Sequence, residues 1–302
     1  MGVVRRPMVA ALITAGAVLV SGCATGSDTA GPVHSAASRT AAVTTTPTTS
    51  TATAGTPTTG TAGTATTGLL RDTAAPASGG AIRGTFKTPG KRLAVGSKGT
   101  AVSTLQRRLK DLGYSPGTID GRYGGATQSA VWAFQKINGI RPTQTGAVGS
   151  ATWKALEDPA TPKVLAPRGR PDRAEVDLTK QVVVLYRRGE VRLISHISSG
   201  SGIPYCETTE WQGKTQKFCG SARTPTGNYK TTWRRSGWHK SYLGELYNPI
   251  FFNGGIAFHG ALSVPLAPAS HGCVRLPMHI AKVLPGLLGT GVPVHVRGAF
   301  RR

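Results

Sequence analysis

The spacing of hydrophobic positions changes along the chain, and each change marks a predicted segment. Near the N-terminus an apolar run, Met8 to Val20, follows Arg5 and Arg6. It is too short to cross a bilayer comfortably, and its position after basic residues is typical of the central part of a secretory signal peptide. We therefore predict a signal peptide over residues 1–22 and an exported protein.

No periodic apolar face follows the signal peptide. Residues 24–80 are dominated by Thr, Ala, Ser, Gly and Pro, as in the stretch AAVTTTPTTSTATAGTPTTG. Such a composition cannot bury enough apolar surface to offset the entropy of ordering the backbone. We predict a disordered tether over residues 23–88, which as a flexible coil would reach across tens of ångströms.

Beyond the tether the apolar positions take helical spacing, which predicts a small helical domain over residues 89–158. Gly113 and Gly139 are placed to end two helices, and Ser150 or a neighbour is placed to cap a third that carries Trp153 and Leu156. Two similar helical faces are predicted, formed by Val102, Leu105, Leu109 and Leu112 and by Val131, Phe134 and Ile137.

After a proline-containing linker at residues 159–172 the apolar period becomes two, which predicts strands. The stretch AEVDLTKQVVVLYRRGEVRLISHISSG predicts successive strands with a hairpin turn at Arg188-Gly189, and TGNYKTTW, PIFFNGGIAFHG and VPVHVRG are similar. Only PMHIAKVLPGLL, with Pro277 near its start, predicts a helix. The chain is thus predicted to be multidomain, with the helical domain followed by a mainly β domain over residues 173–298.

The charge balance points to an anionic partner. The chain carries 36 Lys+Arg against 13 Asp+Glu, a formal net charge of +23. Export argues against nucleic acid, because the accessible polyanions outside a bacterial membrane are lipid headgroups, wall phosphates and peptide carboxylates. A basic surface that serves only solubility is the alternative.

The first of four cysteines, Cys23, directly follows the small residues Ser21 and Gly22 at the end of the apolar run. The stretch LVSGC resembles the lipobox of bacterial lipoproteins. That resemblance implies cleavage before Cys23, lipid on its sulfur and anchoring to the outer face of the cytoplasmic membrane. An ordinary secretory signal with an incidental cysteine is the alternative.

Two further cysteines, Cys206 and Cys219, bracket ETTEWQGKTQKF, a predicted loop without apolar periodicity. In an oxidising compartment we favour a disulfide between them over two free thiols. Closing a loop of this length would contribute about 3 kcal/mol. Cys273 is then left unpaired.

Cys273 lies close in sequence to His271 and within reach of His259 if GGIAFHG and SHGCVRL are neighbouring parts of a sheet. A zinc site would have suitable ligand types, but structural zinc sites usually bring two close ligand pairs and only one is present. A nucleophilic thiol needs only an imidazole as base, for which His259 is placed. Gly272 would let a substrate carbonyl approach, with the N–H groups of Gly272 and Cys273 as oxyanion donors. We predict neither metal nor cofactor.

Nearly the whole helical block resembles a known domain. The stretches GSKGTAVSTLQRRLKDLGY, IDGRYGGATQSAVWAFQ and GAVGSATWKAL are similar to the three-helix peptidoglycan-binding domain attached to many wall enzymes. The resemblance implies a groove near the second helix, with Asp120, Gly124, Thr127 and Gln135 as candidate contacts. Turn and capping roles for these four residues are the alternative, and we favour it at each.

The β domain also resembles a known family. The stretch FHGALSVPLAPASHGCVRLP is similar to the signature of the L,D-transpeptidase catalytic domain, and RTPTGNYKTTW and NPIFFNGGIAFHG extend the match. The resemblance implies a cysteine acyltransferase with Cys273 as nucleophile, His259 as general acid/base, His271 as auxiliary residue and the Gly272 backbone as oxyanion donor. It further implies substrate contacts at Ser270, Arg275 and Gly255, with a structural ion pair as the alternative for Arg275.

The function implied is the formation of 3–3 crosslinks between peptidoglycan stems through a thioester, with peptide stems as donor and acceptor. The alternatives are an L,D-carboxypeptidase that uses water as acceptor, a non-catalytic peptidoglycan-binding lipoprotein and a zinc-dependent wall hydrolase. Two features depart from many relatives. The interval from His259 to Ser270 is short, and the segment between Cys206 and Cys219 is an insertion expected to shape the acceptor site.

Overall fold

The computed structural model describes residues 86–300. The predicted signal peptide, Cys23 and nearly all of the predicted tether lie outside these residues. Within residues 86–300 no helix is long and apolar enough to cross a membrane.

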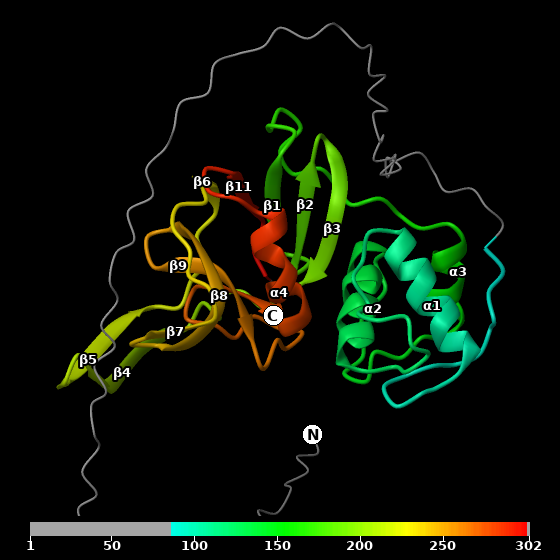
Figure 1. Ribbon diagram of the computed structural model, residues 1–302, viewed down its shortest axis with the longest axis horizontal. Helices are drawn as coiled ribbons and strands as arrows, with labels where there is room; N and C mark the ends of the chain where they lie inside the picture. The colour runs from blue at the N-terminus through cyan, green and yellow to red at the C-terminus, as the bar shows by residue number, and fades with distance from the viewer. Residues whose placement is uncertain (1–85, 301–302) are drawn as a thin grey trace, which may run out of the picture. The chain divides into compact units, whose positions relative to one another are not determined.

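The helical domain contains three helices, as the spacing of apolar residues predicts (Figure 1). They are α1 (Thr100–Asp111), α2 (Gly125–Ile137) and α3 (Ser150–Glu157). The predicted faces are confirmed, since Leu105 and Phe134 are fully buried. Gly113 and Gly139 follow the first two helices with φ of 84° and 69°, a conformation that favours glycine. At α3 the N-cap position belongs to Gly149, and Ser150 is the first helical residue.

The mainly β domain is built from two larger sheets, a two-stranded hairpin and one helix (Figure 1). The first sheet has the order β3-β2-β1-β11-β6, and the second has the order β10-β9-β8-β7. Helix α4 (Met278–Leu287) begins after Pro277, as predicted. The strands of the first sheet are β1 (Arg173–Asp177), β2 (Val182–Arg187), β3 (Glu190–His196), β6 (Gly227–Lys230) and β11 (Pro293–Arg297). Those of the second are β7 (Trp238–Ser241), β8 (Gly244–Asn253), β9 (Ile256–Ala261) and β10 (Val274–Pro277).

The turn between β2 and β3 is the predicted one, since Arg188 and Gly189 have φ of 54° and 84°. The segment around Cys206 and Cys219 differs from the prediction. It forms a two-stranded hairpin of β4 (Pro204–Trp211) and β5 (Lys214–Ser221), in which these cysteines are paired across the strands and joined by the predicted disulfide. Most residues of both strands are exposed, so the sequence carries no alternation of apolar and polar positions from which strands could be predicted.

Strand β2 is buried on both faces. Val183 and Leu185 point into the core between the two sheets and α4, whereas Val182, Val184 and Tyr186 belong to the core of the three helices. This division follows from the period of two, which sends successive side chains to opposite faces. The helical domain and the β domain therefore share a hydrophobic core along β2.

Hydrogen bonds accompany this shared core. The N–H of Ile194 on β3 donates to the carbonyl of Gly113 at 2.9 Å. Lys136 of α2 donates to Nδ1 of His196 at 2.8 Å. Nε2–H of His196 in turn donates to the carbonyl of Val264 at 3.0 Å. The contacts of α2 thus continue through His196 to the loop that follows β9.

We predict that Ile194→Ala destabilises both domains together. Ile194 is 2% exposed in the shared core, and removing such a side chain costs about 2–5 kcal/mol. Denaturant unfolding followed by circular dichroism and tryptophan fluorescence should show one transition at a lower midpoint. Leu262→Ala, at a residue 87% exposed, is the matched control and should change the free energy of unfolding by less than about 0.5 kcal/mol. Separate transitions for the helical and β domains would contradict the shared core.

Candidate active site

The pairing of β9 with β10 brings the predicted base and nucleophile together. These strands are parallel, and Arg275 lies opposite His259. Cys273 directly precedes β10 and packs against Ala257, which lies two residues before His259 on β9. Because residues two apart in a strand share a face, His259 and Cys273 lie on the same face of neighbouring strands. The adjacency expected of GGIAFHG and SHGCVRL is confirmed.

His259 is held as a neutral imidazole of defined tautomer. Its Nδ1 lies 2.9 Å from the carbonyl of Gly260. Because a carbonyl only accepts, Nδ1 carries the proton and Nε2 keeps its lone pair. Burial, with a smaller contribution from the charge of Arg275, lowers the pKa of His259 to about 4. The imidazole is therefore available as a base through Nε2 at neutral pH.

Cys273 is the cysteine with a free thiol among residues 86–300. Burial raises the pKa of this thiol, and a hydrogen bond from the Ala257 backbone and the charge of Arg275 only partly oppose that effect. The sulfur lies 3.6 Å from the carbonyl of Gly255, which can accept a hydrogen bond from the thiol. The unliganded site therefore contains a neutral thiol beside a neutral imidazole.

Hydrogen bonds fix the turn before the cysteine. The hydroxyl of Ser270 donates to the Cys273 carbonyl at 2.5 Å and accepts the N–H of Gly272 at 3.0 Å. Ser270 is 3% exposed and its hydroxyl proton is bonded within the turn, which favours a structural role over the predicted substrate contact. The N–H of Gly272 is bonded as well, which favours the N–H of Cys273 as the oxyanion donor. Thr224 of the TPTG stretch donates to the Gly272 carbonyl at 2.6 Å.

Both His-Gly pairs require their glycine. Gly272 has φ of 141°, which residues with a side chain rarely adopt. At Gly260 a Cβ would lie 2.7 Å from Cβ of Ala281, because α4 packs directly on β9 there. The two glycines thus serve the local backbone geometry next to His259 and Cys273.

His271 is turned toward the β4–β5 hairpin. Its Nε2 lies 2.6 Å from a carboxylate oxygen of Glu207, and its ring makes an edge contact with Tyr205 at a centroid distance of 4.7 Å. Glu207 and Tyr205 could not be predicted as neighbours of His271 from the sequence, in which only the flanking cysteines marked their segment. Within residues 86–300 no three His, Cys, Asp or Glu side chains gather as a metal site would require.

Arg275 and Gly255, the other predicted substrate contacts, both lie beside Cys273. The Gly255 carbonyl faces the thiol. Burial lowers the pKa of Arg275, and the charge of Cys273 partly offsets this effect. The guanidinium is thus within electrostatic range of the sulfur.

The predicted contacts of the helical domain divide into two pairs. Thr127 and Gln135 are 1% and 2% exposed, which favours the structural role over a glycan contact at both. Thr127 donates to the Pro116 carbonyl and accepts from Gln106, a residue that the sequence analysis missed. Asp120 also accepts from Gln106 but lies at the surface, as does Gly124, which caps α2.

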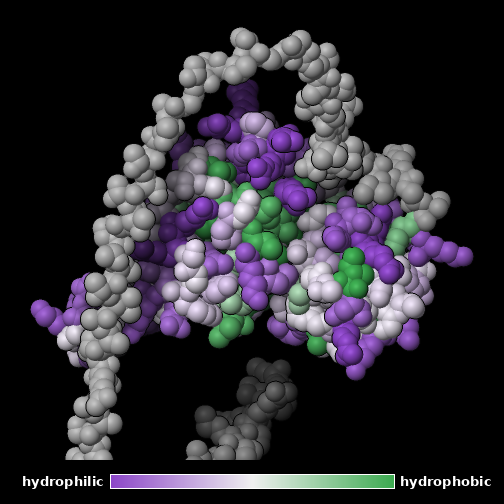
Figure 2. Space-filling model, viewed as in Figure 1, coloured by the Kyte–Doolittle hydropathy of each residue, from purple (hydrophilic) through white to green (hydrophobic). Residues whose placement is uncertain are grey.

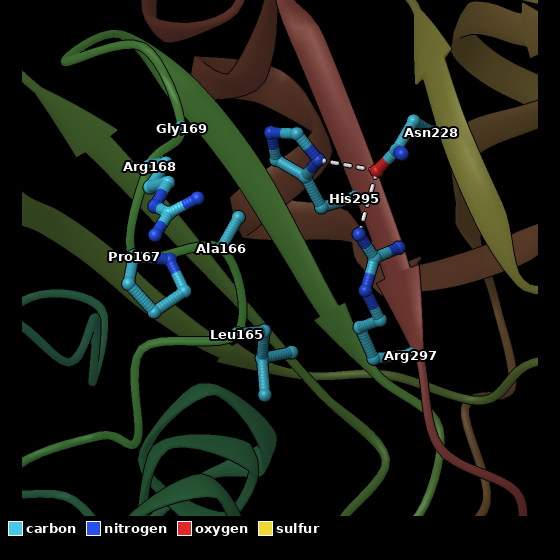
Figure 3. A pocket seen from close by; sticks show the side chains of 8 residues that line it. All are labelled: Leu165, Ala166, Pro167, Arg168, Gly169, Asn228, His295 and Arg297. Carbon is cyan, nitrogen blue, oxygen red and sulfur yellow. Dashed lines mark hydrogen bonds between the residues drawn. The ribbon is translucent and has the colours of Figure 1, made fainter.

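Two cavities lie outside the pair of Cys273 and His259. One, of about 560 Å³, includes Gly200, Arg223 and Thr224 in its lining and adjoins the turn at Gly272 through Thr224. The other, of about 550 Å³, lies between residues 165–169 and strands β6 and β11 (Figure 3). There His295 and Arg297 both donate to the side-chain oxygen of Asn228.

Figure 2 shows mainly hydrophilic residues on the visible face of the described chain.

Comparisons with known proteins agree with this architecture. Residues 98–156 match the putative peptidoglycan binding domain, and residues 171–296 match the L,D-transpeptidase catalytic domain. A solved L,D-transpeptidase from Xylanimonas cellulosilytica (its residues 123–326) is 38% identical, with a TM-score of 0.60, over 68% of this chain and 98% of that one. Another from Stackebrandtia nassauensis is 25% identical over 69% and 96% of the two chains, with a TM-score of 0.39. An uncharacterized protein of Kitasatospora aureofaciens is 34% identical over 85 residues, 28% of this chain and 70% of that relative.

The raised pKa of Cys273 predicts a distinctive pH dependence of alkylation. Only the thiolate reacts, so the rate with iodoacetamide should rise about ten-fold per unit between about pH 6 and pH 9, without a plateau. The protein should carry Cys23→Ser, so that Cys273 is its one thiol outside the disulfide. N-acetylcysteine, which approaches its plateau at its ordinary pKa, is the reference. A rate that is constant from about pH 6 to pH 8 would indicate a preformed thiolate and contradict the neutral pair.

Proposed function

Because the chain belongs to the L,D-transpeptidases, we propose that it forms 3–3 crosslinks in peptidoglycan through a thioester on Cys273. The observation that carries this proposal is the placement of Cys273 on the same face as His259, whose Nε2 keeps its lone pair. A neutral base beside a neutral thiol can take up the thiol proton as the sulfur attacks.

In the first half-reaction the donor is a tetrapeptide stem, attacked at the carbonyl of its third residue. Nε2 of His259 accepts the thiol proton while Sγ of Cys273 bonds to the carbonyl carbon. The N–H of Cys273 serves as oxyanion donor in place of Gly272, whose N–H is bonded to Ser270. His259 then returns the proton to the amine of the leaving D-alanine, and the thioester remains.

In the second half-reaction the side-chain amine of another stem attacks the thioester. His259 accepts a proton from this amine, the bond between carbon and Sγ breaks, and the proton returns to the sulfur. Water in place of the amine would release the free acid, which is the carboxypeptidase reaction. Arg275 favours the developing thiolate through its positive charge, and we assign it the binding of a stem carboxylate.

We assign the helical domain to holding the enzyme on its polymeric substrate, with Asp120 and Gly124 as the surface candidates for contact. The match of residues 98–156 to the putative peptidoglycan binding domain supports this assignment. The signal peptide, lipid on Cys23 and the tether, proposed from the sequence, would attach the protein to the outer face of the cytoplasmic membrane and let it reach the wall.

Cys273→Ala should abolish thioester and dimer formation from tetrapeptide stems, as measured by mass spectrometry, while binding to isolated sacculi stays at the wild-type level. His259→Gln should lower the acylation rate about a hundred-fold or more, because general base catalysis is lost. Thermal unfolding of both variants checks that they are folded. A folded His259→Gln variant that acylates at the wild-type rate would assign the base to another residue, and loss of sacculus binding in Cys273→Ala would contradict separate binding and catalytic sites.

A further inference from the structure

The β4–β5 hairpin contacts the catalytic segment through one face of β4. Tyr205 and Glu207 are two residues apart, so both side chains lie on that face. Tyr205 makes the edge contact with the His271 ring, and Glu207 accepts from its Nε2 at 2.6 Å. Because a carboxylate only accepts, the contact fixes the proton on Nε2 and leaves Nδ1 on the opposite side of the ring.

The hairpin also lies close to the nucleophile. Burial is the main cause of the raised pKa of Tyr205, and electrostatic interactions with the acidic groups of Tyr242, Glu207 and Cys273 add to it. These interactions place the Tyr205 hydroxyl within electrostatic range of the Cys273 sulfur. Glu207 therefore meets His271 at the edge of the same site, although the two residues are 64 positions apart in the chain.

The position of Glu207 is fixed from several directions. Its neighbour Cys206 is bonded to Cys219 on β5, and Glu207 itself lies opposite Phe218. The Phe218 ring stacks on Tyr242 after β7, with centroids 4.2 Å apart. A hairpin of two strands is marginal by itself, and the disulfide and this stacking compensate for that weakness.

Strand β5 also leaves space for the Tyr205 side chain. Gly220 lies opposite Tyr205, and a Cβ at Gly220 would lie 2.8 Å from the Tyr205 hydroxyl. The absence of a side chain there lets the ring lie across β5. Both residues that contact His271 are thus held by cross-strand neighbours.

We propose that Glu207 is a positioning residue for this reaction. Its carboxylate holds the His271 imidazole in one orientation and one tautomer beside Cys273, and the disulfide-closed hairpin positions that carboxylate. This inference rests on the proposed function. The carboxylate does not touch the reacting atoms and acts through His271.

The test compares three changes by the rate of Cys273 acylation with a tetrapeptide stem. Glu207→Ala should lower kcat about five-fold with a smaller change in KM, the upper end for an ion pair that is partly exposed to solvent. Glu207→Gln keeps an oxygen that accepts from Nε2 and should recover most of the rate. Glu210→Ala is the matched control on the same strand, since Glu210 accepts from Thr215 and should leave the rate unchanged.

A double-mutant cycle with His271→Ala tests whether Glu207 acts through the imidazole. In the His271→Ala background, Glu207→Ala should change the rate by less than about two-fold. The inference is overturned if Glu207→Ala acylates at the wild-type rate, if Glu207→Gln is as slow as Glu207→Ala, or if Glu207→Ala costs the same factor in both backgrounds. Absence of a thioester in the wild-type protein would instead refute the proposed function itself.

Discussion

The active site depends on the parallel pairing of β9 with β10. His259 and Cys273 are separated in sequence by the loop that follows β9, and the register that sets Arg275 opposite His259 brings the cysteine to the same face. A slip by one residue would turn the side chains of one strand to the other face and separate the pair. The hydrogen bonds of Ser270 at the turn and the packing of α4 on β9 act on these same segments and help to hold this register.

Burial then sets the charge state of the paired groups. It lowers the pKa of His259 to about 4 and raises the pKa of Cys273, so both are neutral before substrate arrives. In the proposed reaction, the negative charge needed for attack on a carbonyl develops only as the proton moves from sulfur to Nε2. Arg275 lies where its positive charge favours that development. Burial disfavours the thiolate, but it also strengthens the electrostatic attraction between the thiolate and Arg275, because the local dielectric constant is low.

The features that could be predicted from the sequence are those set by side-chain spacing and backbone preference over a few neighbouring residues. The helical face containing Leu105 and the turn at Arg188-Gly189 follow from side-chain spacing and backbone preference, and the juxtaposition of His259 and Cys273 follows from strand adjacency. The β4–β5 hairpin was not predictable because its strands are exposed and lack alternation. Long-range hydrogen bonds also leave no local pattern. For this reason the burial of Thr127 and the contact of Glu207 with His271 became visible only in the structure.

Strand β2 imposes a condition on how such a chain can evolve. The boundary between the two matched families falls between residues 156 and 171, but the hydrophobic cores meet at β2, inside the second family. A recombination event at the family boundary that exchanged the helices would leave Val184 and Ile194 facing water unless the incoming partner had a complementary surface. The boundary between the matched families is therefore not the boundary at which the folded protein can be divided.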